Sequence, residues 1–157
     1  MSQERLIAAC QLISHARTGV LATLSHTLDG HPMASTAAVG NDAQGQLILF
    51  LSELAEHTRN LEADPRLSVL LTRPHEQGVH EEARLTMMGQ AERFCPDTAL
   101  TARLFQQVPQ WAHYQQLPDF HFWRVTPLRL RLISGFGAAS WIAATDYLKT
   151  AATIFVD

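Results

Sequence analysis

Side chains that bind anions are concentrated in residues 52–60, directly after a short apolar run. Helical spacing of the apolar residues predicts a helix in this segment, with Ser52 as its N-terminal cap. The first turn of a helix leaves free N–H groups and a partial positive charge, so it attracts anions. The hydroxyls of Ser52 and Thr58 and the imidazole of His57 could therefore hold a phosphate. The alternative is that Ser52 only caps the helix, while His57 and Arg59 lie on its solvated face.

Two predicted strands carry residues that could complete such a site. The strand at residues 33–39 has only small side chains from Ala34 to Ala38, which would let a flat ligand lie against the backbone. Tight packing against a neighbouring strand is the alternative explanation. Arg84 belongs to the strand at residues 84–94, where a guanidinium needs an anionic partner or a route to water. An ordinary surface position would satisfy it equally well.

The remaining polar residues do not predict a metal site or a known catalytic motif. His75 and His80 share a segment with three glutamates, but their spacing matches neither a helix face nor a standard zinc site, so we expect a solvated loop. Asp119 and His121 are possible acid–base residues for which the sequence offers no partner. The patterns GxGxxG, GxxxxGK[ST] and GxSxG are all missing, which argues against a Rossmann domain, a P-loop enzyme and a serine hydrolase.

Tight turns separate most of the predicted strands. The Asp29-Gly30 pair predicts a hairpin, and strands joined in this way pair antiparallel. Pro127 predicts an edge position or a bulge, whereas residues 138–157 fit strand and helix equally. The predicted strands cover residues 20–24, 33–39, 47–51, 67–72, 84–94 and 120–133, and the predicted helices cover an opening segment that ends before Gly19, residues 54–61, residues 96–108 and a weaker piece at 110–116. We therefore expect an α+β fold in which an antiparallel meander, flanked by short helices, curls into a barrel.

The composition limits the class of protein. The chain has 157 residues and a formal net charge of −3, so we expect one domain over residues 1–157 and no general affinity for nucleic acid. No apolar run is long enough to span a membrane, and the first residues lack the features of a secretory signal. Cys10 and Cys95 are too far apart for a CxxC centre and are predicted to be small buried hydrophobes. A reducing cytoplasm is the expected compartment.

The order of these segments resembles the FMN-binding split β-barrel superfamily of pyridoxamine 5′-phosphate oxidase. Within it, the likeness is greatest to the haem-utilisation branch, the HugZ-type and HutZ-type proteins. The likeness covers roughly residues 17–141. Its most specific part is the order serine, leucine-alanine, histidine-threonine and asparagine from Ser52 to Asn60. The segments that carry the resemblance are residues 19–24, 29–35, 51–61, 64–68, 83–92 and 135–137.

The resemblance implies a six-stranded split barrel and an obligate homodimer with FMN at the interface. The positions that match the family's flavin contacts are Ser35, Thr36 and Ala37 for the ring, Ser52, His57 and Thr58 for the phosphate, and Arg84, which falls where the oxidase has a flavin-contacting glutamine. Arg84 would then supply positive charge, because Glu56, His57 and Thr58 occupy the region of the oxidase's arginine-lysine pair.

Two departures from the family pattern narrow the expected activity. Residues 134–139 replace the oxidase's Arg-x-His motif, so oxidation of pyridoxamine phosphate is not expected. Haem-degrading members take their iron ligand from a histidine in a C-terminal extension, whereas the last histidine here is His121. We therefore expect an FMN-binding protein, leaning towards an FMN-dependent oxidoreductase of unknown substrate, and we name no catalytic residue. The alternatives are a haem-binding or haem-degrading protein of the HugZ/HutZ type and a non-catalytic ligand-binding split barrel.

Overall fold

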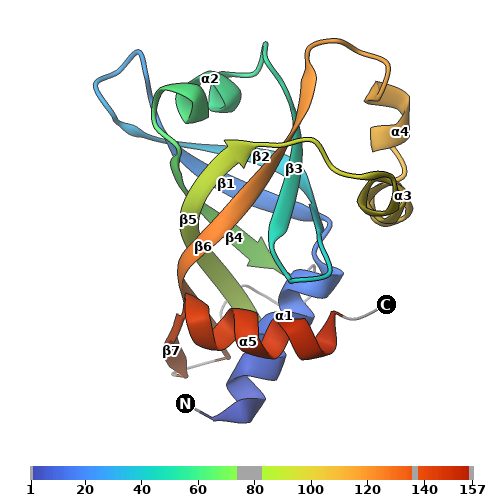
Figure 1. The fold of residues 1–157 in the computed structure, drawn as a ribbon. Helices are drawn as coiled ribbons and strands as arrows, with labels where there is room; N and C mark the ends of the chain where they lie inside the picture. Colours follow the sequence, from blue (N-terminus) through green and yellow to red (C-terminus); the bar gives the residue numbers. More distant parts are fainter. Residues whose placement is uncertain (1, 74–82, 136–137, 156–157) are drawn as a thin grey trace.

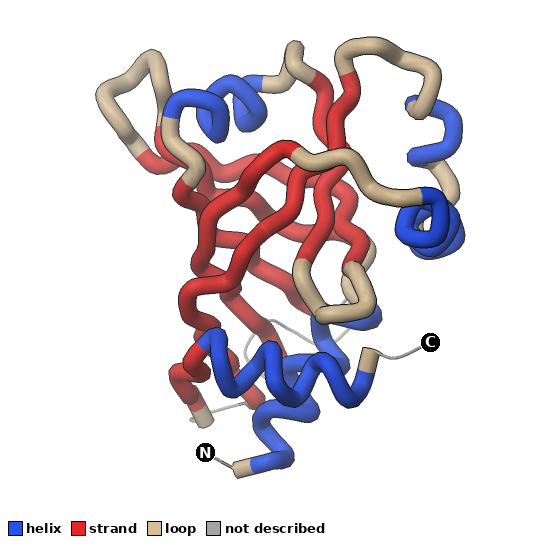
Figure 2. Tube along the Cα trace, viewed as in Figure 1, coloured by secondary structure: helices blue, strands red, loops and turns tan. Residues whose placement is uncertain are grey.

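The structure is a computed structural model that describes residues 2–73, 83–135 and 138–155. Strands form its centre, and helices cover its ends and one side (Figure 2). The strands are β1 (Thr18–Leu24), β2 (Pro32–Asn41), β3 (Leu47–Ser52), β4 (Arg66–Thr72), β5 (Ala83–Arg93), β6 (Phe120–Ser134) and β7 (Ala139–Ala143). The helices are α1 (Gln3–His15), α2 (Glu56–Ala63), α3 (Thr98–Gln107), α4 (Trp111–Tyr114) and α5 (Ala144–Ile154).

The sheet closes on itself because β3 and β6, which are far apart in the sequence, pair antiparallel. The strand order is β3-β2-β1-β4-β5-β6-β7, so β1 to β6 form the barrel and β7 extends it beyond β6 (Figure 1). The predicted α+β class and six-stranded split barrel are confirmed. The connectivity is more than a meander, since β1 pairs with both β2 and β4.

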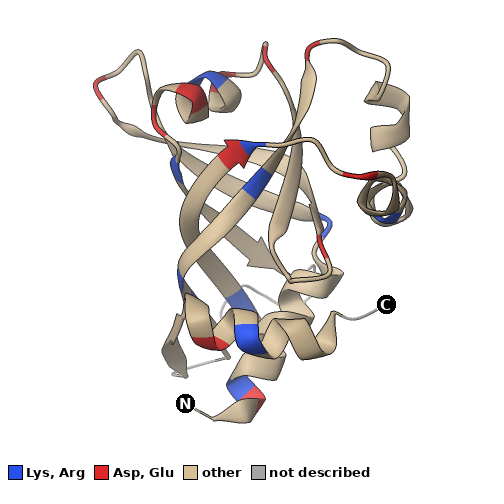
Figure 3. Ribbon diagram, in the orientation of Figure 1, with Lys and Arg blue, Asp and Glu red and all other residues tan. Residues whose placement is uncertain are grey.

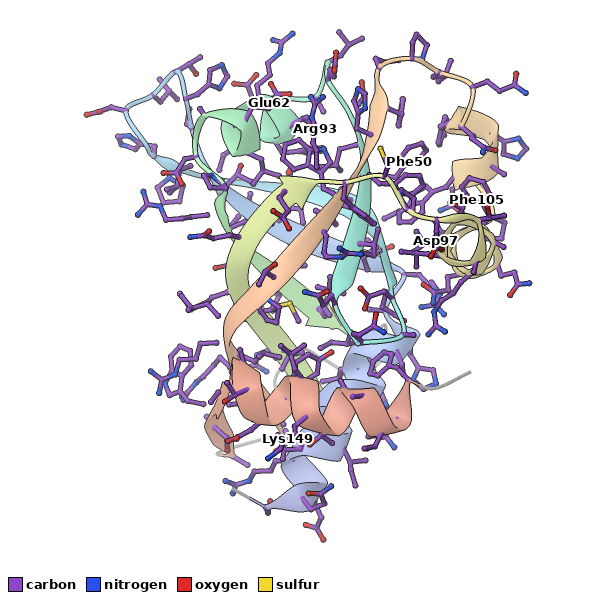
Figure 4. The ribbon with its side chains drawn as sticks, viewed as in Figure 1. Phe50, Glu62, Arg93, Asp97, Phe105 and Lys149 are labelled. Carbon is purple, nitrogen blue, oxygen red and sulfur yellow. The ribbon has the colours of Figure 1, made fainter. Side chains whose placement is uncertain are left out.

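Alternation along each strand separates a core-facing side from an outward side. On β5 the predicted inward positions Leu85, Met87, Gly89 and Ala91 are all buried. Strand β3 is apolar on both sides, as its continuous apolar run predicts. Its odd-numbered leucines enter the barrel core, and Ile48 and Phe50 join a second apolar cluster under α3 and α4. Phe50 and Phe105 point into that cluster from β3 and α3 (Figure 4).

Local sequence signals account for the turns. Asp29 and Gly30 have φ values of 50° and 74°, the left-handed conformation of a tight hairpin, so the predicted hairpin is confirmed. Pro127 faces Gly89 at a bulge. It lies between the part of β6 that pairs with β3 and the part that pairs with β7, so neither of these two ladders needs the N–H that proline lacks.

The undecided C-terminal residues form β7 and α5, and α5 packs beside α1 across one end of the barrel (Figure 1). Cys10 is buried as predicted. The prediction for Cys95 is wrong, because this residue lies in the connection between β5 and α3 and is exposed. The predicted polar loop at residues 74–82, with His75 and His80, lies outside the described residues.

The bulge generates a stability prediction. A Cβ atom added to Gly89 would lie 2.3 Å from the carbonyl oxygen of Thr126, a backbone atom that cannot rotate away. We expect Gly89→Ala to lower the free energy of unfolding by about 1–3 kcal/mol, the usual cost of overpacking. Urea unfolding measures this, with Gln90→Ala, an exposed neighbour on the same strand, as the control. Equal stabilities of the two variants would contradict the close approach of β5 and β6.

Candidate functional site

The loop between β3 and α2, predicted to hold a phosphate, is tied to the start of β6. The hydroxyl of Ser52 donates to the carboxylate of Asp119 at 2.6 Å and accepts from the N–H of Leu54 at 3.1 Å. The N–H of Glu53 donates to the carbonyl of Asp119 at 2.8 Å. The predicted capping role of Ser52 is wrong, since α2 begins only at Glu56. The reason is that barrel closure places Ser52 opposite Phe120, next to Asp119.

Charged residues gather at the same end of the barrel (Figure 3). Glu53 contacts Nη1 of Arg93 at 3.2 Å and Nε2 of His121 at 2.9 Å. Arg93 also pairs with Glu62 of α2, as Figure 4 shows. Asp119 and His121, which had no partner in the sequence, therefore have partners in this loop. Their contacts fasten the loop and helix α2 to β5 and β6.

Helix α2 presents two of the predicted residues to the barrel. Nδ1 of His57 lies 3.0 Å from the hydroxyl of Ser35, a contact that the sequence did not predict. Burial lowers the pKa of the His57 imidazole below its ordinary value, because a protonated ring would lose hydration there. Thr58 is fully buried, and its hydroxyl has no hydrogen-bond partner among the described residues.

Asn60 anchors α2 through both ends of its side-chain amide. Its side-chain carbonyl accepts from the backbone N–H of His26 at 3.0 Å and lies 2.8 Å from Nδ1 of the same residue. Its amide group donates to the hydroxyl of Thr23 at 3.0 Å. The side chain is completely buried, so these bonds join α2 to β1 and to the β1–β2 hairpin. The sequence signature contains Asn60, but only the fold shows that its role is structural.

The β3–α2 loop does not fit a phosphate group. An anion needs positive charge or free hydrogen-bond donors. The hydroxyl of Ser52 is not a free donor, because it already donates a hydrogen bond to the Asp119 carboxylate. Glu56 adds negative charge beside it, the charge of Glu53 is paired with Arg93, and burial favours a neutral His57. Arg59, on the exposed side of α2, is the cation closest in sequence to these residues.

The outward face of the barrel, made by the outward-pointing side chains of β2, β1, β4, β5 and β6, offers a different surface. Residues directly opposite each other on neighbouring strands share a face. One row across the sheet is Ala34, Ala22, Ser68, Met88 and Arg129, and the next is Thr36, Val20, Leu70, Thr86 and Arg131. Both rows begin with small or apolar side chains and end with an arginine.

A groove of about 350 Å³ crosses this face from β1 to β6. Two of its apolar walls, Met88 and Leu128, are 40% and 73% exposed. The other lining residues are Ala22, Thr23, Leu24, Pro32, Arg66, Leu67, Ser68, Gly89 and Gln90. The groove was not predicted, because it depends on the pairing of four strands and on the extra residue that the bulge gives β6. Apolar residues at outward positions of a predicted strand, such as Met88, are the signal by which the sequence could indicate this groove.

The other predicted site residues are divided between the two sides of the sheet. Thr36 is exposed on the outward face, whereas Ala37 packs against the barrel core and Ser35 faces His57. A ring that lay on the outward face would meet the side chain of Thr36 but only the backbone of the other two. Arg84 is half-buried on β5, opposite Thr72 and Ile133, and is therefore remote in the sheet from the β3–α2 loop.

Within the described ranges, no group of three or more histidine, cysteine, aspartate or glutamate side chains could hold a metal ion. Over the same ranges, none of the helices combines the length and the apolar character that crossing a bilayer requires.

Comparison with known proteins gives one family and several relatives. A sequence model of the CREG β-barrel family matches residues 2–149. The non-canonical haem oxygenase HOZ of Arabidopsis thaliana chloroplasts is 33% identical over 132 residues, which are 83% of this chain and 40% of that protein. Haem oxygenase HutZ of Vibrio cholerae is 27% identical over 124 residues, 74% of this chain and 70% of that protein. The chain thus spans less than half the length of the Arabidopsis relative.

Solved structures give the same picture of the fold. A haem-binding protein from Mycobacterium smegmatis superposes with a TM-score of 0.86 at 30% identity, over 95% of this chain and 62% of that one. A Clostridium acetobutylicum protein of the pyridoxinephosphate oxidase family superposes with a TM-score of 0.70 at 12% identity, over 94% of this chain and 99% of that one. The second likeness shows the fold alone.

The buried imidazole of His57 generates a prediction on pH. Because its folded-state pKa lies below that of the unfolded chain, about 6.5, the unfolded state binds more protons as the pH falls below that value. The free energy of unfolding should therefore decrease between pH 7.5 and 5.5. We expect a smaller decrease in His57→Gln, measured by urea unfolding, and an unchanged decrease in His15→Gln, which alters an exposed histidine. A decrease in His57→Gln as large as in the wild type would contradict this account.

Proposed function

This chain belongs to the CREG β-barrel family, and from that premise we propose that it binds haem in the groove on the outward face of its barrel. Its predicted resemblance to the FMN-binding split barrels, and within them to the haem-utilisation branch, is confirmed. Two relatives are named as haem oxygenases and a third as a haem-binding protein. Haem, the alternative cofactor in the sequence analysis, thus has more support than FMN.

The apolar groove is the observation that carries the proposal. Haem is a flat and largely apolar ring with two carboxylates on one edge. Ala22, Leu24, Pro32, Met88 and Leu128 supply apolar walls, and burial of apolar surface is the main driving force for such a ligand. Neighbouring strands lie about 4.8 Å apart, so the groove extends roughly 14 Å across the four strands from β1 to β6. The row of the sheet in which Ala22, Ser68 and Met88 line the groove ends in Arg129.

FMN binding, the first expectation from the sequence, has less support. A flavin needs donors or positive charge for its phosphate, whereas in the β3–α2 loop the hydroxyl of Ser52 donates to Asp119 and Arg93 is paired with Glu53. An FMN-dependent oxidoreductase therefore stays a prediction. Breakdown of bound haem is a second candidate function, favoured by the names of two relatives.

We also propose a homodimer in which a second copy lies across the outward face and covers the groove. Val20, Met88 and Leu128 are 37%, 40% and 73% exposed on this one face. Contiguous exposed apolar side chains mark interaction surfaces. Light scattering of the purified protein tests the proposal, and a monomer at micromolar concentration would contradict it.

Both cysteines are free, which is compatible with the proposed cytoplasmic compartment.

Haemin titration tests the proposed ligand. We expect a Soret band that saturates at a fixed ratio of haemin to chain, whereas added FMN should keep its free fluorescence. Loss of the Soret band after ascorbate is added under oxygen would indicate haem breakdown. Flavin fluorescence quenching without a saturating Soret band would overturn the haem proposal in favour of FMN.

A pair of matched variants tests the location. Leu128 and Leu54 are 73% and 74% exposed, but only Leu128 lines the groove. We expect Leu128→Glu to weaken haemin binding at least about tenfold, because the bound ring would desolvate an unpaired carboxylate. Leu54→Glu, which adds the same charge elsewhere, should bind as the wild type does. The Soret titration measures both, and equal affinities of the two variants would place the ligand outside the groove.

A further inference from the structure

Two arginines hold an exposed indole at the β6–β7 edge of the outward face. The guanidinium carbons of Arg129 and Arg131 lie 4.9 and 5.1 Å from the ring centroid of Trp141, which is 45% exposed. These distances are within the range of cation–π attraction. We refer to Arg129, Arg131 and Trp141 as the arginine–tryptophan cluster.

Strand pairing fixes the direction of this cluster. Arg131 lies opposite Thr86 on β5 and opposite Trp141 on β7, so all three side chains share the outward face. Arg129 is two residues earlier on β6 and therefore points to the same side. Arg84, two residues before Thr86, adds a third guanidinium to this face.

The cluster is continuous with the haem groove. Met88 lines the groove and is the direct cross-strand partner of Arg129. Leu128, the other protruding wall, immediately precedes Arg129 in the chain. A flat ligand in the groove with its charged edge towards β6 would therefore bring that edge to the two guanidinium groups.

The positive charge of the cluster favours the binding of an anion. The described residues show no carboxylate within ion-pair distance of Arg129 or Arg131. The two positive charges on one indole repel each other, so a bound anion would relieve the repulsion. The planar guanidinium groups match the two oxygens of a carboxylate. Stacking on Trp141 restrains both side chains before any ligand arrives, which lowers the entropy cost of binding.

We propose that the arginine–tryptophan cluster binds the propionate carboxylates of haem and so fixes the orientation of the ring in the groove. The inference rests on the proposed function, since it names the residues that hold one edge of the same ligand. Arg66, which lines the groove from β4, donates from Nε and Nη2 to the two carboxylate oxygens of Asp64. That pairing leaves Arg129 and Arg131 as the better match for an incoming carboxylate.

The experiment compares haemin with haemin dimethyl ester, which keeps the ring and iron but lacks both negative charges. Soret titrations are run on the wild type, on Arg129→Gln/Arg131→Gln and on the control Arg5→Gln/Arg59→Gln, which removes two exposed arginines elsewhere. We expect the first double variant to raise the Kd for haemin about tenfold or more, as for the loss of a charge-assisted hydrogen bond. Its Kd for the ester should stay at the wild-type value, and the control should not change either.

The outcomes separate this inference from the proposed function. A wild-type protein without a Soret band would overturn both. A wild type that binds haemin, with a double variant of equal affinity, would overturn only the role of the cluster. An equal loss for haemin and ester would also overturn it, because it would indicate a structural effect. If the double variant does not fold by circular dichroism, Arg129→Gln alone is used, since Arg129 is exposed and should show the same selective loss.

Discussion

The pairing of β3 with β6 is the constraint on which the rest of the structure depends. It joins Leu47–Ser52 to residues 120–125 and converts a strongly curved sheet into a closed barrel. Closure removes the open edges of both strands and gives every strand one side in the core and one side outside. It also brings Ser52 beside Asp119, which are 67 residues apart in the sequence. Whether Ser52 is a free donor for a phosphate therefore depends on this long-range contact and not on the local helix.

Closure leads to two chemically different regions. At the α2 end, hydrogen bonds and ion pairs of Ser52, Glu53, Asn60 and Arg93 are satisfied by neighbouring protein groups, so they hold the fold together. The outward face is different, because the apolar walls of its groove are exposed, and because Arg129 and Arg131 are stacked on an indole without a carboxylate partner among the described residues. Surface of this kind is completed by a ligand or a second chain, and an apolar ring with anionic groups matches both of its properties.

Local patterns predicted the elements well, since hairpin residues such as Asp29-Gly30 and alternation on β5 act over short distances. The resemblance added the barrel and the family. Pairing between distant strands cannot be predicted from local patterns. Local patterns therefore make Ser52 a helix cap and give no indication of the groove. Residues 138–157 stayed undecided because the burial of Ile142 and Tyr147 depends on contacts with β6 and with the turn at Gly45. The resemblance assigned Ser35 to the ring and His57 to the phosphate, and their direct contact depends on how α2 lies against β2.

The central claim is that the outward groove, and not the β3–α2 loop, is the ligand site. The most direct measurement is the amide NMR spectrum of the protein with one equivalent of ferric haem, whose paramagnetic iron broadens nearby signals. The account predicts the strongest broadening at groove residues 22–24, 66–68 and 88–90. Strongest broadening at residues 52–58, with the groove signals unchanged, would contradict it.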